Sequence, residues 1–268
     1  MIRVLGIDLA AQPDKTGAVF IEPSRAGRWK ARELDGPATD DRLVDAVRSV
    51  DVVGVDAPLG WPTAFVAALA AHASMRAWPG EVDRSALTHR ETDRRVRELT
   101  GQSPLSVSAD KLGVTAMRCA LLQRRWAAEI WRRPAPRDGS GPLVEAYPAA
   151  ALRAWGIDII GYKGSSGDKA HSGRRARSTI VAAVGAATGR WLDLAVIEDR
   201  CEASDHVLDG LVSALVAIAC RSSMTETPIG HNVALTEGWI HIPTNRLSEL
   251  RPSTLPEPTD REGTQKEP

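Results

Sequence analysis

Short apolar runs that each carry one acidic residue recur along the chain, and this pattern predicts buried strands. Such runs occupy residues 4–10 around Asp8, 52–56 ending on Asp56, and 143–146 around Glu145. Four to eight apolar residues bounded by a turn signal are typical of a strand inside a sheet. An ionised carboxylate there is costly unless it is paired, hydrogen-bonded or bound to a cation. The pattern therefore suggests that carboxylates gather at one place on a sheet.

Two more segments, 17–21 and 28–34, predict a second strand and a third, edge-type strand. Because short loops join them to the first strand, the three are expected to form an antiparallel meander. Residues 40–50 have apolar positions at helical spacing and acids at their start, which predicts a helix leading into strand 52–56. A strand–helix–strand crossover favours parallel pairing of that strand with one of the first three.

The remainder of the chain is mainly helical. Between residues 57 and 133 the sequence predicts a helical insert with helices at 63–75, 88–100 and 115–131. Further on, we expect helices at 148–155, 174–188 and from Ser204 onward, and a hairpin or edge strands at 233–235 and 239–242. Residues 251–268 hold four Pro and little that is apolar, which predicts a disordered tail. We therefore expect one α/β domain over residues 1–250.

The long late helix carries two further acids. Asp205 and Asp209 are four residues apart, so they lie on one face of the helix. Asp205 lies in the first turn, where the helix dipole favours an acid, and this is a sufficient structural explanation. Asp209 lies one turn further in, and the residues from there to Cys220 are apolar or small. A mostly buried helix with one internal Asp suggests a partner for that charge.

Composition changes this picture little. A chain of 268 residues with 43% hydrophobic and 25% charged residues is typical of a globular protein. Its 34 basic and 34 acidic residues balance, which argues against a protein that coats nucleic acid. Residues 84–177 nevertheless hold 18 Lys or Arg against 9 Asp or Glu. This excess is compatible with a face that binds a polyanion or with helix surfaces that are simply rich in arginine.

Cysteine usage and hydropathy exclude several classes of protein. The three cysteines are widely spaced, and no Cys/His cluster suggests zinc or a disulfide framework. No signal peptide is visible, and no apolar run approaches the roughly 18 residues of a membrane span. We therefore expect a cytoplasmic protein without a membrane partner.

The acids favour one kind of chemistry. The candidate set is Asp8, Asp56 and Asp209, with Glu145 and Asp205 in reserve. Oxygen ligands without sulfur or imidazole favour hard cations, Mg²⁺ or Mn²⁺. Two such ions could clamp a phosphodiester, one activating water and the other stabilising the leaving oxygen. A lone Asp near a strand end is more often structural, so this hypothesis depends on the joint placement of the acids.

Several motifs resemble those of one protein family. They are Gly6-Ile7-Asp8, residues 55–60 (Val-Asp-Ala-Pro-Leu-Gly), 145–149 (Glu-Ala-Tyr-Pro-Ala), Tyr162-Lys163, 237–240 (Glu-Gly-Trp-Ile) and, in the insert, 90–97. The likeness spans about residues 3–243 and is to the family called domain of unknown function 429, regarded as predicted nucleases of ribonuclease H-like fold. The order of meander, helix, acid-bearing strand and late Asp-bearing helix is also similar to that fold.

The resemblance implies a divalent-metal-dependent nuclease that acts on DNA or RNA. In such an enzyme Asp8, Asp56 and Asp209 would form the metal-binding triad, with Asp8 bridging two ions. Residues 206–209 are similar to the closing element of Holliday-junction resolvases. Glu145 or Asp205 would position water, and Asp205 is a further candidate ligand.

An arginine-rich helix is one candidate for contact with the substrate. Arg90, Arg94 and Arg97 fall at i, i+4 and i+7 of the predicted helix at 88–100. They could grip phosphates, or they could simply be solvated, and the spacing allows both interpretations.

Other candidate substrate contacts lie later in the chain. A glycine- and serine-rich loop at 164–173 carries Lys169 and leads to Arg174. It could contact substrate or be a solvated linker. Tyr147 and Lys163 could likewise bind substrate or serve the structure.

Two other functions stay open. The turn at 11–17 could cradle phosphate, as in the sugar kinases and actin-like ATPases that share this strand core, which would give a nucleotide-dependent phosphotransferase or ATPase. This turn holds a single glycine, Gly17, rather than a glycine-rich run. The third possibility is a non-enzymatic module that keeps its acids for folding or cation binding.

Overall fold

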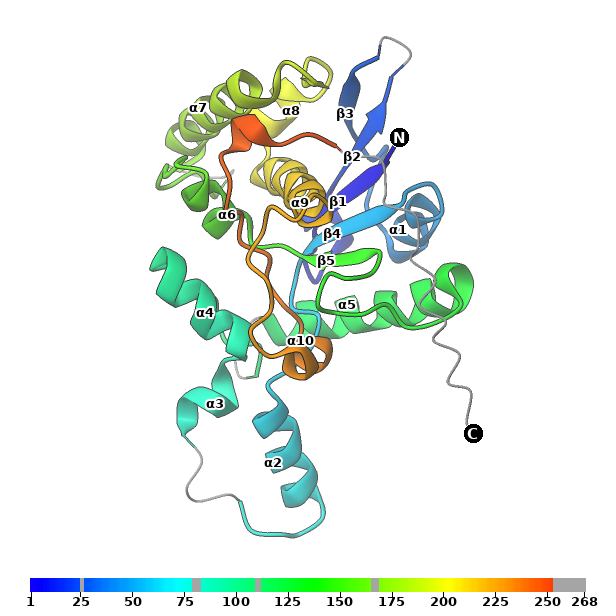
Figure 1. Ribbon diagram of the computed structural model, residues 1–268, viewed down its shortest axis with the longest axis vertical. Coiled ribbons are helices and arrows are strands. Elements are labelled where there is room, and N and C mark those ends of the chain that lie inside the picture. Colours follow the sequence, from blue (N-terminus) through cyan, green and yellow to red (C-terminus); the bar gives the residue numbers. More distant parts are fainter. Residues whose placement is uncertain (25–26, 79–82, 109–111, 165–168, 253–268) are drawn as a thin grey trace, which may run out of the picture.

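A six-stranded mixed β-sheet lies at the centre of the computed structural model (Figure 1). The structure describes residues 1–24, 27–78, 83–108, 112–164 and 169–252, of which Lys169 and Ala170 are described by their backbone alone. In spatial order the strands are β5 (Leu143–Glu145), β4 (Val52–Asp56), β1 (Val4–Asp8), β2 (Gly17–Pro23), β3 (Trp29–Glu33) and β6 (Leu192–Asp193).

The pairing of these strands is that of a meander extended by parallel strands. β1, β2 and β3 pair antiparallel, whereas β4 pairs parallel to β1, β5 to β4, and β6 to β3. The helix α1 (Asp40–Val47) makes the crossover between β3 and β4. The expected mixed α/β architecture and the parallel placement of strand 52–56 are therefore confirmed.

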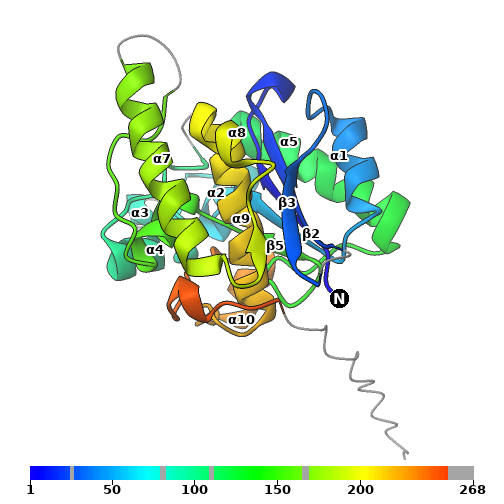
Figure 2. The ribbon, with the colours of Figure 1, turned by 90° about the horizontal axis from the view of Figure 1, so that it is seen from above.

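Side chains that alternate along the strands fill two hydrophobic cores, one on each face of the sheet. Val4 and Val52 pack into one core, and Leu5 and Val53 pack into the other. Figure 2 shows helices on both faces of the sheet. The first core is covered by α9 (Asp205–Arg221), α7 (Lys169–Thr188) and α8 (Glu198–Ala203), and the second by α1 and α5 (Leu112–Trp126). Burial on both faces explains why the strands read as nearly continuous apolar runs.

Glycines in neighbouring strands let α9 approach the sheet closely. A Cβ atom at Gly6 of β1 would collide with the backbone oxygen of Gly210, and one at Gly54 of β4 with that of Ser213. Gly6 and Gly54 are register partners on adjacent parallel strands. Because a residue without a side chain is needed at such a contact, these glycines hold the part of α9 that carries Asp209 directly against β1 and β4.

The helical insert follows β4 and extends beyond one end of the sheet (Figure 1). It comprises α2 (Thr63–Ala73), α3 (Arg84–Thr88), α4 (Glu91–Thr100) and α5, which ends in a π-helical turn (Ala127–Trp131). The carboxylate of Glu237, in α10 (His231–Glu237), accepts hydrogen bonds from the backbone amides of Thr63 (2.7 Å) and Glu91 (2.9 Å). These bonds fasten the base of the insert to the late part of the chain.

Two local expectations about the elements are wrong. The predicted helix at 88–100 is two helices, because α3 ends at Thr88 and α4 begins only after Arg90. The proposed strand at 233–235 lies inside α10, and the segment at 239–242 contributes a single bridge between Ile240 and Glu145. At the first place, the carboxylate of Asp93 accepts a hydrogen bond from the Arg90 amide and so starts a new helix. At the second, a short apolar pattern fits more than one element, so contacts elsewhere in the fold decide.

Other differences concern length and position. The helix expected at 148–155 is α6 (Pro148–Ala154), and α7 begins earlier than its predicted start at Arg174. β6 and α8 were not anticipated, because two and six residues are too few to show a period. Most of the predicted tail, 253–268, lies outside the described residues, and the single-domain boundary stays a prediction.

Candidate metal centre and the cavity beside it

Asp8, Asp56 and Asp209 come together at one end of the sheet. Asp8 ends β1 and Asp56 ends β4, and the two are register partners on adjacent parallel strands. Asp209 lies near the start of α9, which packs across both strands. One carboxylate oxygen from each of the three lies within 4.8 Å of the others. Segments far apart in the sequence thus place three acids in one small volume.

Burial makes the negative charges of this triad costly. Asp209 is 1% exposed, and burial raises its pKa to about 6, with the Asp8 charge contributing in the same direction and Lys163 opposing it. Burial also raises the pKa of Asp56 well above its usual range; Lys163 opposes this shift, and Asp8 and Asp209 increase it. The three carboxylates therefore need further positive charge to be ionised together.

The protein supplies part of that charge, at two of the three acids. The Nζ atom of Lys163 lies 2.8 Å from Oδ2 of Asp209, whose Oδ1 accepts a hydrogen bond from the Tyr162 hydroxyl at 2.9 Å. Nδ1 of His206 lies 2.7 Å from Oδ2 of Asp8. No described residue donates a hydrogen bond to the carboxylate of Asp56 or forms an ion pair with it. Asp56 is therefore the acid whose charge the described residues leave without a direct partner.

The triad has the donor chemistry of a site for a hard cation. All three ligands are carboxylate oxygens, which suit Mg²⁺, Mn²⁺ or Ca²⁺ better than soft metals. The shared volume is small enough for one ion to reach an oxygen of each acid. The triad could thus hold a metal ion, and a cation placed there would relieve the repulsion that raises the pKa of Asp56 and Asp209.

Glu145 is buried close to the triad but has a different partner. It is 1% exposed, and its Oε1 lies 2.7 Å from Nη2 of Arg90. Its Oε2 accepts hydrogen bonds from Nη1 of Arg90 (2.9 Å) and from the backbone amide of Leu59 (3.2 Å). Burial raises the pKa of Glu145, and Arg90 opposes that effect. Both residues border the cavity described below, yet their charged atoms are bound to each other.

Of the two interpretations of Arg90, the one that places it on a solvated helix face is wrong. Arg90 occupies the N-cap position before α4 and is 2% exposed. It pairs with both oxygens of Asp93 as well as with Glu145. Arg94 is exposed, and its Nη1 donates to the carbonyl of His89 at 2.8 Å. The break between α3 and α4 causes this difference, because it turns Arg90 away from the helix surface.

Three more predicted residues are not part of the group of acids that could hold a metal ion. Oδ2 of Asp205 accepts a hydrogen bond from the amide of Gly164 at 2.8 Å, and its buried Oδ1 has no partner among the described residues. Arg174 is exposed and lies 3.8 Å from Glu202. Lys169 begins α7, but its side chain is outside the described part of the structure.

Tyr162 was named only as part of a family motif. His206, next to Asp205, fits either a proton shuttle or a histidine that is inert at a helix start. A signal for His206 exists, because it precedes Asp209 by three residues and so shares its helix face. Tyr162 belongs to an irregular segment that follows α6, where no period could reveal which way its side chain points.

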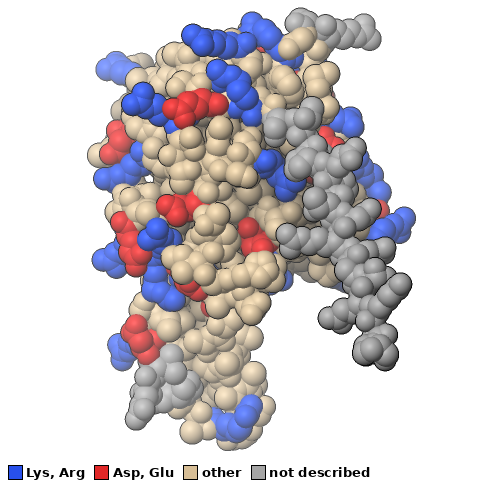
Figure 3. Space-filling model, in the orientation of Figure 1, with Lys and Arg blue, Asp and Glu red and all other residues tan. Residues whose placement is uncertain are grey.

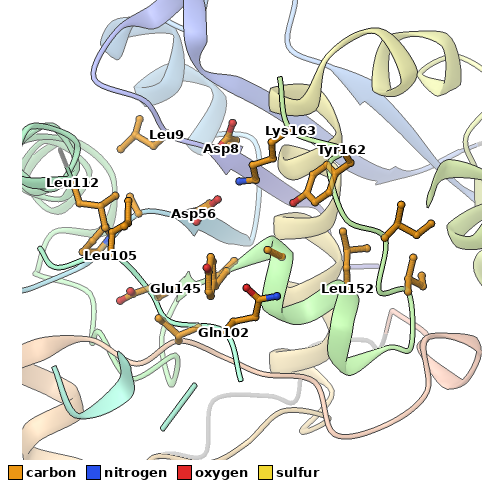
Figure 4. Close-up of a pocket in the computed structure, with 18 of the residues that line it drawn as sticks. Asp8, Leu9, Asp56, Gln102, Leu105, Leu112, Glu145, Leu152, Tyr162 and Lys163 are labelled. Carbon is orange, nitrogen blue, oxygen red and sulfur yellow. The ribbon is translucent and has the colours of Figure 1, made fainter. Parts of the chain in front are cut away.

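A cavity of about 520 Å³ opens beside the triad (Figure 4). Asp8 and Asp56 line it together with Lys163 and Tyr147, two residues predicted to contact substrate. The other lining residues are mostly apolar, and several come from the helical insert and from the segment that follows α6. The position and size of the cavity fit a site that binds a small molecule or one unit of a polymer.

The turn at 11–17 is held by internal hydrogen bonds. Thr16 Oγ1 accepts from the Ala10 amide at 3.2 Å, and the amides of Lys15 and Thr16 donate to carbonyls within the turn. The guanidinium of Arg118 also binds the carbonyl of Ala10 and the hydroxyl of Thr16. These amides are therefore not directed at a phosphate, which weakens the nucleotide-binding alternative.

Surface charge does not single out one binding face. On the face shown in Figure 3, basic and acidic side chains alternate around the edges, and a broad uncharged area lies between them. The described residues on that face show no continuous basic strip. Some arginines of residues 84–177 are buried in ion pairs, as Arg90 is with Asp93 and Glu145, and so do not contribute to a basic surface.

Comparison with known proteins gives one match. The model of the family described as "Protein of unknown function (DUF429)" matches residues 6–232, which include the whole triad. No curated protein and no solved structure shows significant similarity to the chain. Within the described residues, no helix has both the length and the apolar character required to cross a bilayer.

Proposed function

The chain belongs to the DUF429 family, and we propose that it is a divalent-metal-dependent nuclease that hydrolyses phosphodiester bonds in nucleic acid. One observation carries the proposal: an oxygen from each of Asp8, Asp56 and Asp209 lies within 4.8 Å of the others beside an open cavity. The strand order and the late Asp-bearing helix, which resemble the ribonuclease H-like arrangement, support it further.

Mg²⁺ or Mn²⁺ is the proposed cofactor because the triad offers only oxygen ligands. An ion held by Asp8, Asp56 and Asp209 would activate a water molecule and stabilise negative charge on a phosphate. Of the three acids, Asp56 is best placed to give its whole carboxylate to this purpose, since no described residue engages it.

The residues around the triad have supporting roles in this proposal. The Tyr162 hydroxyl orients the carboxylate of Asp209, and His206 orients that of Asp8, whereas Lys163 neutralises part of the charge of Asp209. The Lys163 side chain is 52% exposed and lines the cavity, so its ammonium group can also reach a substrate phosphate. Removal of Tyr162 or His206 should weaken metal binding or activity by about 10–100-fold, as is typical of groups that orient metal ligands.

The test is cleavage of labelled single-stranded and duplex DNA and RNA with Mn²⁺ or Mg²⁺. We expect cleavage of at least one substrate, and a loss of more than about a hundredfold in Asp8→Asn, since a ligand should contribute at least as much as the groups that orient it. Asp199→Asn, an exposed acid on α8, is the matched control and should keep wild-type activity.

Three results would separate the proposal from its alternatives. Cleavage that persists in Asp8→Asn would mean that the triad is not the active site. Turnover of ATP without cleavage of nucleic acid would favour a phosphotransferase. Absence of any response to divalent cations, in activity or in thermal stability, would leave the acids a structural role.

A further inference from the structure

The cavity beside the triad combines an acidic end with apolar walls, and we propose that it receives one unpaired nucleobase of the substrate. This inference rests on the proposed nuclease function and names the part of the nucleic acid that the site recognises. The base would enter next to the phosphate held at the triad. The substrate would then be single-stranded, or locally unpaired, at the position of cleavage.

The walls of the cavity are contributed by three separate segments. Leu105 and Leu112 come from the insert, Leu152 comes from α6, and Ile157 and Ile159 come from the segment that follows α6. Figure 4 shows Leu105 and Leu112 on one side of the cavity and Leu152 on the other. Two apolar walls that face each other suit a flat aromatic ring better than they suit a charged sugar–phosphate backbone.

The polar lining groups differ in what they leave available, because Arg90 and Glu145 are bound to each other. Asp8, Asp56 and Lys163 lie at one end of the cavity, and Gln102 lies away from them (Figure 4). A ligand that fills this space needs a phosphate-like group at the first end and an apolar, planar body between the walls. A nucleotide unit has both features, whereas a peptide or a lipid offers no phosphodiester next to a flat ring.

Two polar side chains in the cavity have free hydrogen-bonding capacity. The side-chain amide of Gln102 and the hydroxyl of Tyr147 have no hydrogen-bond partner among the described residues, although both residues line the cavity. An amide side chain offers a donor and an acceptor together, which matches the edge of a base. The Tyr147 ring is half-buried and can stack on the base.

The size of the cavity argues against an intact duplex as the bound form. A volume of about 520 Å³ is that of a small-molecule site, not of a groove that follows two strands. A base inside a duplex is stacked and paired, so it must leave the helix before it can enter such a pocket. Single strands, ends and mismatched positions make this step easier.

Binding of nucleotides tests the inference without catalysis. We would titrate the protein with each nucleoside 5′-monophosphate and with ribose 5-phosphate, which lacks the base, in the presence of Ca²⁺. The monophosphates should bind at least about tenfold more tightly than ribose 5-phosphate, as expected from one stacked base. Equal affinities for the two kinds of ligand would overturn the inference.

Matched variants locate the binding. Ala149→Phe fills the cavity from α6 and should abolish the difference between nucleotide and ribose 5-phosphate. Ala154→Phe makes the same change at an exposed position of the same helix, outside this cavity, and should preserve it. If Ala149→Phe does not fold, Gln102→Leu serves instead and should alter the order of preference among the four bases. Unchanged nucleotide affinity in both cavity variants would contradict the proposal.

Cleavage assays separate this inference from the proposed function. Wild-type protein should cut a single strand at least about tenfold faster than the same sequence in a blunt duplex. Equal rates would refute the base pocket while leaving the nuclease intact. Nucleotide binding without cleavage of any nucleic acid would support the pocket and contradict the nuclease.

Discussion

Two groups of acids lie at neighbouring strands of the sheet, each completed by an acid from a helix, and the protein surrounds them differently. Next to β5, Glu145 and Asp93 share Arg90, and each of their four carboxylate oxygens contacts its guanidinium group. At the ends of β1 and β4, Asp8, Asp56 and Asp209 approach one another within 4.8 Å. There, no described residue contacts the carboxylate of Asp56 as a donor or cation.

The number of partners that a carboxylate has helps to distinguish a structural acid from a functional one. A buried carboxylate that is fully paired ties the fold to its partner, because removing the partner would leave a buried charge uncompensated. Buried carboxylates that outnumber their partners destabilise the fold unless a ligand completes them. By this criterion we expect Glu145 to stabilise the fold and the triad to bind a ligand.

The largest effect is expected on the paired side, in Arg90→Met. This change leaves Glu145 and Asp93 buried without their cation, so the free energy of unfolding should fall by about 3–5 kcal/mol. Urea denaturation measures it. Arg94→Met, at an exposed position, is the control and should change stability by less than about 0.5 kcal/mol. A loss below about 1 kcal/mol in Arg90→Met would contradict the claim that Glu145 and Asp93 depend on Arg90.

In the triad, by contrast, neutralising an acid should raise the free energy of unfolding. The pKa of Asp209 in the folded protein, about 6, lies above its ordinary value of 3.8, so the folded state holds this proton more tightly. The stability that this bound proton contributes is present below about pH 4 and is lost as pH rises through 6. In metal-free protein at pH 8, Asp209→Asn should therefore raise the free energy of unfolding by on the order of 1 kcal/mol.

Comparison of pH values and metal concentrations checks that sign. The gain in Asp209→Asn should shrink at pH 4, where the wild-type acid is protonated as well. It should also disappear when Mg²⁺ is added at saturating concentration, because the ion stabilises only the protein that retains the acid. Destabilisation by Asp209→Asn at pH 8 would show that Lys163 and Tyr162 already complete this carboxylate.

A smaller effect should follow removal of the competing cation. Lys163 lies 2.8 Å from Asp209 and also lowers the pKa of Asp56, so its charge opposes entry of a metal ion. Lys163→Gln should tighten Mn²⁺ binding by about two- to tenfold, in keeping with partly screened charges. Titration calorimetry would show this. Weaker Mn²⁺ binding would mean that Lys163 orients a ligand rather than competing with the ion.

Much of this arrangement could be predicted from sequence because its elements have strong local signals. The apolar run at β1 contains an acid, the run at β4 ends on one, and Asp209 interrupts a long apolar helix, so each acid is conspicuous within its own segment. The parallel placement of β4 then follows from the crossover through α1. Local pattern and connectivity were sufficient for the triad.

The surroundings of the triad could not be predicted in the same way. Arg90 lies at the break between α3 and α4, and its pairing with Glu145 depends on how the insert packs on β5. Tyr162 and Lys163 lie in an irregular segment, where no period shows the direction of a side chain. The cavity combines residues from three separated segments, so no single stretch of sequence reveals it.

Titration of metal-free protein with Mn²⁺ determines whether the triad, and not Glu145, holds a metal ion. Asp56→Asn and Glu145→Gln are measured beside the wild type. Asp56 and Glu145 end adjacent strands, so the two variants make the same chemical change a short distance apart. We expect the wild type and Glu145→Gln to bind Mn²⁺ alike, and Asp56→Asn to lose at least about tenfold in affinity. Equal binding by wild type and Asp56→Asn, or no binding by the wild type, would contradict the account.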